Sequence, residues 1–131
     1  MMWAKALFEP ESVAVVGSTS PGKLGHVVTS QLVAGGFDRV RLVSPKGEGA
    51  LGAPGYRSIG EIPSPPELVV VASPADTVAG VIEDAGRAGV AVAVILTAGF
   101  SEVGNAAQEK ALLDVARRSG IRLVGPNCAG I

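Results

Sequence analysis

The chain has 131 residues, of which 47% are hydrophobic and 18% are charged, with one Cys, one His and a formal net charge of −1. Such a chain is long enough to bury one sizeable core and too apolar to be disordered. The single Cys excludes an internal disulfide and a multi-Cys zinc site, and the lack of a basic excess argues against nucleic acid or an anionic membrane as a main partner.

The first ten residues lack the pattern of a targeting segment. Lys5 and Glu9 interrupt the apolar residues, so we expect no signal peptide there. Trp3 and Phe8 in this segment, and Phe37 further on, are expected to be packing groups. No apolar run along the chain reaches the roughly 18–20 residues that span a bilayer. We therefore expect a cytoplasmic protein that has no membrane partner.

A strand predicted over Ser12–Val16 is followed by the most informative segment of the chain, a glycine-rich turn that leads into a helix beginning near Gly25. Such a turn leaves backbone N–H groups free, and the helix dipole favours negative charge, so α/β folds bind phosphate at this place. The candidate phosphate-binding residues of the turn are Gly17, Ser18, Thr19, Ser20, Pro21, Gly22, Lys23 and Gly25.

The spacing of this turn differs from the dinucleotide fingerprint, which has Gly at its first, third and sixth positions. Gly17 and Gly22 occupy the first and sixth positions, but Thr19 stands at the third. The turn therefore predicts a phosphate-binding loop with a different ligand preference. His26, at the start of the helix, is expected to be structural, with donation to a phosphate as the alternative.

Four more strands are predicted, all rich in Val and Ile with little polar alternation, at Val40–Val43, Leu68–Ala72, Val90–Leu96 and Arg122–Val124. Strands of this kind form a parallel sheet that is buried on both faces. The stretch 45–66 is rich in Gly and Pro, and it is expected to be a connection with a short strand near Tyr56 and a helical turn near Ile59–Ile62.

Helices are predicted between the strands. One has Ser73 as its N-cap, Pro74 in its first turn, Gly89 as its stop and apolar residues at helical spacing, namely Val78, Val81, Ile82 and Ala85. Another runs from about Ala106 to Ser119, with Gly120 as its stop. This β-α-β order predicts a single Rossmann-like α/β domain over residues 1–131, a doubly wound parallel sheet that binds ligands at the carboxyl ends of its strands.

Every predicted strand ends in residues that are small or carry a hydroxyl group. Small residues let a ligand approach the backbone, and hydroxyls and free N–H groups supply hydrogen-bond donors. Beyond the first turn, the candidate ligand residues are Ser44, Lys46, Ser73, Pro74, Thr97, Ala98, Gly99, Asn127 and Cys128. No catalytic residue is assigned, since Cys128 has no evident His–acid pair to activate it. No metal ligand is assigned, since the single His has no Cys cluster near it.

Lys46 carries most of the information about the ligand. In dinucleotide-binding domains this position usually holds an acid that binds the ribose hydroxyls. A lysine instead suits a ligand with a phosphate beside the adenosine ribose, such as the 3′-phosphate of coenzyme A or the 2′-phosphate of NADP, and Lys23 could add charge near the pyrophosphate. A solvated surface lysine, and for Ser73 and Pro74 a plain helix cap, are the alternatives.

Several motifs together resemble the N-terminal CoA-binding domain of NDP-forming acyl-CoA synthetases. That family includes the ADP-forming acetate–CoA ligases, and the domain is similar to the N-terminal domain of the succinyl-CoA synthetase α-subunit. The motifs cover essentially the whole chain: Leu7–Gly17 with Gly22–Gly25, Val43–Gly47, Ala72–Ala75, Thr97–Glu102 and Gly125–Gly130.

The resemblance implies a coenzyme A site made of the strand ends. Thr19–Gly22 would cradle a CoA phosphate, and Lys46 would meet a phosphate or the ribose end. Ser73 and Pro74 would line the path of adenine and pantetheine, and Thr97–Gly99 would follow the pantetheine arm. Asn127 and Cys128 would lie near the thiol end.

The resemblance also implies partner domains. Family enzymes use a phosphorylated histidine in a following domain and an ATP-grasp domain, and His26 does not match the phosphohistidine motif. We therefore expect this chain alone not to make acyl-CoA, and expect the two other domains to act with it in cis or in trans. The alternatives are an NADP- or NAD-binding domain of an oxidoreductase or redox sensor, a free-standing CoA-binding or interaction module, and a fusion with an acetyltransferase.

Overall fold

The computed structural model describes residues 2–97 and 106–125 of the chain. Within them the chain forms six strands, of which the first, fourth and fifth in chain order are runs rich in β-branched residues, and every strand pair is parallel. The spatial order is β3-β2-β1-β4-β5-β6, and the strands are β1 (Val13–Val16), β2 (Val40–Val43), β3 (Gly55–Tyr56), β4 (Leu68–Val71), β5 (Val92–Ile95) and β6 (Arg122–Val124). The predicted doubly wound parallel sheet is confirmed, and its strand order switches between β1 and β4.

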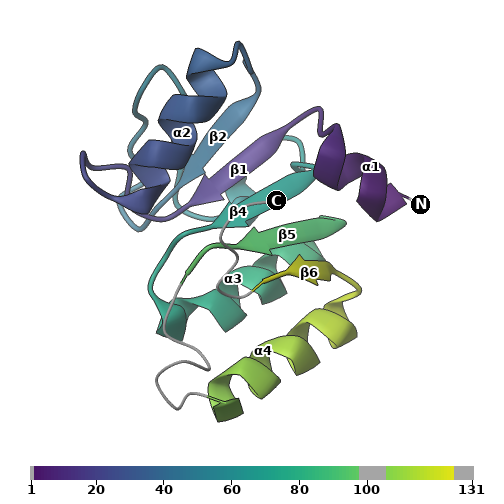
Figure 1. Ribbon diagram of the computed structural model, residues 1–131. Helices are drawn as coiled ribbons and strands as arrows, with labels where there is room; N and C mark the ends of the chain where they lie inside the picture. The colour runs from purple at the N-terminus through teal and green to yellow at the C-terminus, as the bar shows by residue number, and fades with distance from the viewer. Residues whose placement is uncertain (1, 98–105, 126–131) are drawn as a thin grey trace.

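Helices cover both faces of the sheet, as Figure 1 shows. One face packs against α3 (Ala75–Arg87), α4 (Ala106–Ser119) and the short 3₁₀ helix η1 (Ile59–Glu61). The other face packs against α1 (Met2–Phe8) and α2 (Leu24–Ala34). Alternate residues of a strand point to opposite faces, so Val13 and Val15 enter the second core while Ala14 and Val16 enter the first.

The register of the sheet brings the strand ends level with one another. Val16 pairs with Val43 on one side and with Val71 on the other, and Val71 pairs with Ile95. The residues that follow β1, β2 and β4 therefore leave the sheet side by side. This alignment places three loops from distant parts of the sequence at one edge.

Most element boundaries agree with the sequence within one or two residues. Gly89 and Gly120 follow α3 and α4 with φ of 85° and 72°, a backbone conformation that favours glycine, so both predicted stops are confirmed. The short strand near Tyr56 and the helical turn near Ile59 are also present.

Two expectations were wrong. Pro74, rather than Ser73, is the N-cap residue of α3, and no side chain caps that helix, because the Ser73 hydroxyl faces Thr77 instead. Phe8 is 68% exposed and is not a packing group. Phe37 does pack against the core beside α2, whereas the side chain of Trp3 lies outside the described part.

The described helices include none with the length and apolar character needed to cross a membrane.

Candidate functional site

Gly17 brings the ends of β1 and β4 into direct contact. Its φ is 137°, and a Cβ atom added there would lie 2.8 Å from the backbone carbonyl carbon and oxygen of Ala72. The Gly17 N–H still donates to the Val43 carbonyl, at 2.9 Å, so the residue is fixed between the two neighbouring strands. Only a residue without a side chain fits this position, which is the strand-order switch of the sheet.

The loop after β1 keeps several N–H groups available. Within the described residues, the backbone N–H groups of Ser18, Thr19 and Gly22 have no acceptor, while Ser20 donates to the Ser18 hydroxyl at 3.3 Å and Lys23 to the Ser20 carbonyl at 3.0 Å. The N-cap residue of α2, Lys23, makes no side-chain capping bond. Free N–H groups beside an uncapped helix start are suited to an anionic oxygen.

Gly25 allows the helix to start directly under this loop. A Cβ atom at Gly25 would collide with the carbonyl oxygen of Ser18. One turn further, the buried hydroxyl of Thr29 donates to the Gly25 carbonyl at 2.7 Å. The close approach holds the loop against the first turn of α2.

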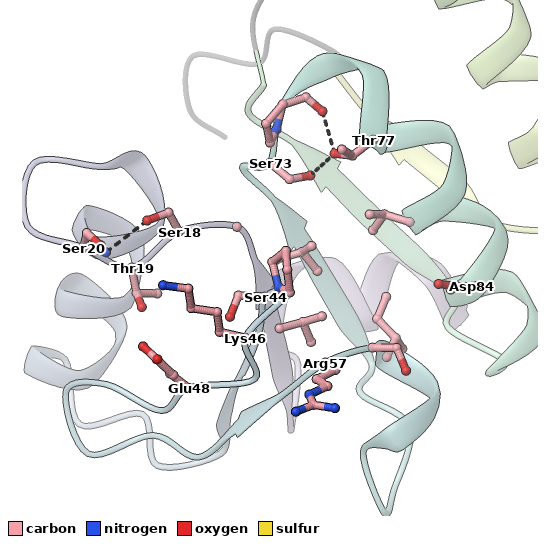
Figure 2. Close-up of a pocket in the computed structure, with 18 residues that line it drawn as sticks. Ser18, Thr19, Ser20, Ser44, Lys46, Glu48, Arg57, Ser73, Thr77 and Asp84 are labelled. Carbon is pink, nitrogen blue, oxygen red and sulfur yellow. Dashed lines mark hydrogen bonds between the residues drawn. The ribbon is translucent and has the colours of Figure 1, made fainter.

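The loop after β2 is a tight turn that presents Lys46. The Gly47 N–H donates to the Ser44 carbonyl at 3.0 Å, and Gly47 has a φ of 68°. Ser44 is anchored in turn, because its N–H donates to the Tyr56 carbonyl at 3.0 Å. In Figure 2 the amino group of the exposed Lys46 points toward the loop that carries Thr19.

A hydroxyl cluster stabilises the end of β4. The Thr77 hydroxyl lies 2.6 Å from the Pro74 carbonyl and 2.9 Å from the hydroxyl of the buried Ser73. The buried Thr97 hydroxyl donates to the Ser73 carbonyl at 2.7 Å. The backbone carbonyls of Ser73 and Pro74, which follow β4, are thus held by a hydroxyl from after β5 and by one from α3, respectively.

These loops enclose a cavity of about 500 Å³, drawn in Figure 2. Eight predicted ligand residues line it together: Gly17, Ser18, Thr19, Ser20, Ser44, Lys46, Ser73 and Pro74. The cavity lining does not include Pro21, Gly22, Lys23, Gly25 or Thr97. The other predicted ligand residues, Ala98, Gly99, Asn127 and Cys128, lie outside the described residues.

Sequence reasoning missed part of the lining. Thr77, Val81 and Asp84 form one wall from α3, and their i, i+4, i+7 spacing after Pro74 was a signal available in the sequence. Arg57 follows β3 directly, so the strand-end rule applied to that short strand would have found it. Glu48 belongs to the Lys46 loop, and no sequence pattern distinguished it.

The lining is chemically uneven from one end to the other. The free N–H groups of the first loop and Lys46 lie at one end, and Asp84 lies at the opposite end of the view in Figure 2. The lining also includes the apolar side chains of Pro45, Ile59 and Val81. Such a cavity is suited to a ligand with phosphates at one end and a planar apolar group next to them. A cluster of His, Cys, Asp or Glu able to hold a metal is absent among the described residues.

Comparison with known proteins gives one family and several longer relatives. Residues 11–131 match the family model described as a CoA binding domain. The chain is 37% identical to the α-subunit of acetate–CoA ligase [ADP-forming] I of Pyrococcus furiosus. That alignment covers 99% of this chain and 30% of the subunit. It is 41% identical to acetate–CoA ligase [ADP-forming] I of Archaeoglobus fulgidus, over 95% of this chain and 18% of that enzyme.

A solved structure shows the same arrangement. The dinucleotide forming acetyl-coenzyme A synthetase 1 of Ca. Korarchaeum cryptofilum, in complex with phosphate and ADP, superposes with a TM-score of 0.92 at 38% identity. The alignment covers 99% of this chain and 28% of that one. The chain thus spans less than a third of the length of each of these relatives.

Proposed function

The chain belongs to the family of CoA-binding domains, and from that premise we propose that the cavity at the ends of β1, β2 and β4 holds the adenosine and phosphate end of coenzyme A. The observation that carries the proposal is the meeting of an uncapped, N–H-rich loop with Lys46 at one end of a single cavity. A volume of about 500 Å³ lies within the range of small-molecule sites.

In the proposed complex the N–H groups of Ser18 and Thr19 donate to the pyrophosphate, as the uncapped helix start favours. Lys46 pairs with a phosphate oxygen, which is a charge-assisted contact. The adenine ring lies against the apolar part of the lining, beside Pro45, Ile59 and Pro74. These groups bind and orient CoA, and no bond of the ligand is broken by them.

One of the predicted ligand residues, Thr97, acts at a distance from the cavity in this proposal. Thr97 holds the Ser73 carbonyl, so it positions the end of β4 rather than facing the adenosine end. The pantetheine arm would continue from there past residues 97–99 and toward Asn127 and Cys128. That part of the path stays a prediction from the family resemblance.

For the whole protein we propose an acid–CoA ligase of the ADP-forming kind, because two relatives with high coverage of this chain are acetate–CoA ligases. Since they are much longer than this chain, the phosphohistidine and ATP-grasp functions would be supplied in cis or in trans. A cytoplasmic location fits that chemistry and stays a prediction.

Isothermal titration calorimetry with CoA, dephospho-CoA and NADPH tests the proposal. We expect saturable CoA binding, weaker binding of dephospho-CoA, and weaker binding of NADPH than of CoA. An absence of CoA binding at millimolar concentration would overturn the proposed site. NADPH binding that is tighter than CoA binding would favour an oxidoreductase or redox-sensing domain instead.

A further inference from the structure

Arg57 lines the cavity from directly after a strand, as the predicted ligand residue Ser44 does. β3 pairs in parallel with β2, and Tyr56 is the partner of Val43, so Arg57 leaves the sheet where Ser44 does. Both residues line the same cavity. Figure 2 shows Lys46, Glu48 and Arg57 on one side of the view, opposite Ser73 and Thr77.

The backbone and stem of Arg57 are held in place. The Arg57 N–H donates to the Glu61 carboxylate at 3.0 Å. The side chain crosses Gly47, since a Cβ atom built at Gly47 would lie 2.9 Å from the Arg57 Cγ. Arg57 therefore packs directly over the turn that presents Lys46, and its position depends on a glycine in that turn.

The guanidinium of Arg57 has no carboxylate oxygen within 4 Å among the described residues. Arg87 differs, since it pairs with both Glu83 and Asp84 on α3. An arginine that lines a cavity without an acidic partner has its planar set of donors available for an anion.

The local charge count shows why a second cation matters. Lys46 and Glu48 lie in the same loop and both line the cavity, so their formal charges cancel. When only lining side chains are counted, Arg57 makes this side of the cavity positive by one unit, since the Glu61 carboxylate that accepts from the Arg57 N–H is not part of the lining. A phosphate monoester carries about −1.5 to −2 charges at neutral pH, and a neutral rim would not offset its desolvation.

We propose that Arg57 is a specificity-determining residue of the site, the second cation that binds the phosphate monoester on the ribose of the ligand. The inference rests on the proposed CoA function for the identity of that ligand. In Figure 2 the Lys46 amino group points toward Thr19 and the Arg57 guanidinium points away from it, so the exposed Arg57 side chain turns toward Lys46 when both bind the monoester. The loop after β1 binds the pyrophosphate. The same chemistry would suit the ribose phosphate of NADP, so the experiment includes both ligand pairs.

The test measures dissociation constants of the 131-residue chain for CoA, dephospho-CoA, NADPH and NADH by calorimetry. The variants are Arg57→Ala, Arg57→Lys and, as a matched control, Arg118→Ala, which removes an exposed arginine of α4. We expect Arg57→Ala to weaken CoA binding roughly tenfold or more, as for one charge-assisted hydrogen bond, and to change dephospho-CoA binding less than twofold. Arg57→Lys keeps the positive charge but loses the planar pair of N–H donors of the guanidinium. Its preference for CoA over dephospho-CoA should therefore lie between those of the unmodified chain and Arg57→Ala.

The outcomes separate this inference from the proposed function. If the unmodified chain fails to bind CoA, the proposed CoA site and the role of Arg57 are both overturned. If the chain prefers CoA to dephospho-CoA and Arg57→Ala keeps that preference in full, the role of Arg57 is overturned and the CoA site stands. An equal loss for CoA and dephospho-CoA also overturns it, because the monoester would then not be what Arg57 binds. A larger effect on the NADPH–NADH pair than on the CoA pair would assign the monoester to NADP and overturn the CoA identity. Thermal melting of each variant checks that it is folded. If Arg57→Ala unfolds, the role of Arg57 is measured with Arg57→Lys instead.

Discussion

At the scale of single residues, Gly17 and Lys46 contribute to the cavity in different ways. Gly17 contributes only the absence of a side chain, which lets β1 and β4 end in contact with each other. Lys46 contributes charge, and it can do so because Gly47 turns the chain immediately after it. The first effect belongs to folding and the second to binding, so substitutions at the two positions should have different signatures.

Lys46→Ala should weaken CoA binding by roughly 1.5–3 kcal/mol, since a charged hydrogen bond to phosphate is lost. The melting temperature should stay unchanged because the side chain is exposed and makes no hydrogen bond or ion pair with a described residue. Calorimetry with CoA measures the affinity. Lys110→Ala, which removes an exposed lysine of α4, is the control, and an unchanged CoA affinity in Lys46→Ala would remove Lys46 from the site.

Gly17→Ala should destabilise the fold by about 1–3 kcal/mol, because the new methyl group meets backbone atoms of Ala72 and the backbone conformation is strained for any residue with a Cβ. CoA binding should weaken together with stability, since the loop must move away from β4. Urea denaturation gives the free energy of unfolding. A variant as stable as the parent would show that the two strand ends are not in tight contact.

At the scale of elements, the cavity is a product of four loops and one helix face. The loops follow β1, β2, β3 and β4, and α3 supplies the wall with Thr77, Val81 and Asp84. The opposite face of α3 is buried in the core through Val78, Ile82 and Ala85. The same helix therefore connects the stability of the core to the shape of the site, and its exposed positions outside the cavity lining are free to change.

Gly80→Ala tests whether an exposed position of α3 can change without affecting the cavity. Gly80 is exposed within α3, and a Cβ atom there would meet nothing within 4 Å, so alanine should stabilise the protein by about 0.5–1 kcal/mol through helix propensity. CoA affinity should not change, since Gly80 does not line the cavity. Urea denaturation and calorimetry on the same sample measure both quantities. A stability loss would mean that α3 packs against something at this position.

At the scale of the whole molecule, the site exists only when the sheet is folded. Its lining spans positions 16 to 84 of the chain, and pairing of β2, β1 and β4 is what brings those segments together. An unfolded chain cannot reproduce that arrangement, so CoA should bind the folded state alone.

Saturating CoA should therefore raise the thermal midpoint of the chain. At a ligand concentration about 100 times its dissociation constant, linkage gives roughly 2.7 kcal/mol of added stability. Differential scanning fluorimetry with CoA and dephospho-CoA at equal concentrations measures the shift. Dephospho-CoA should give the smaller one, and equal shifts would argue against recognition of the ribose phosphate.

The sequence by itself determined the parallel sheet and the edge that carries the site. Unbroken apolar runs such as Val13–Val16 and Leu68–Val71 have no polar face, so they can only be central strands with helices on both sides. Glycines at Gly17 and Gly22 and the lysine at position 46 then follow strand ends, whose common edge is a property of the topology. These are local patterns, and local patterns are readable in a sequence.

Only the tertiary structure decided which residues share the cavity. Thr97 follows a strand as Ser44 does, yet its hydroxyl turns to the Ser73 carbonyl, whereas Arg57 and Asp84 line the cavity. The pairing of the short strand β3 with β2 fixes Arg57, and the burial of Val78 and Ile82 fixes the rotation of α3 that presents Asp84. Both are long-range packing choices made between segments far apart in the chain. Local patterns could therefore mark Arg57 and Asp84 as candidates, but they could not decide that the two residues line the same cavity.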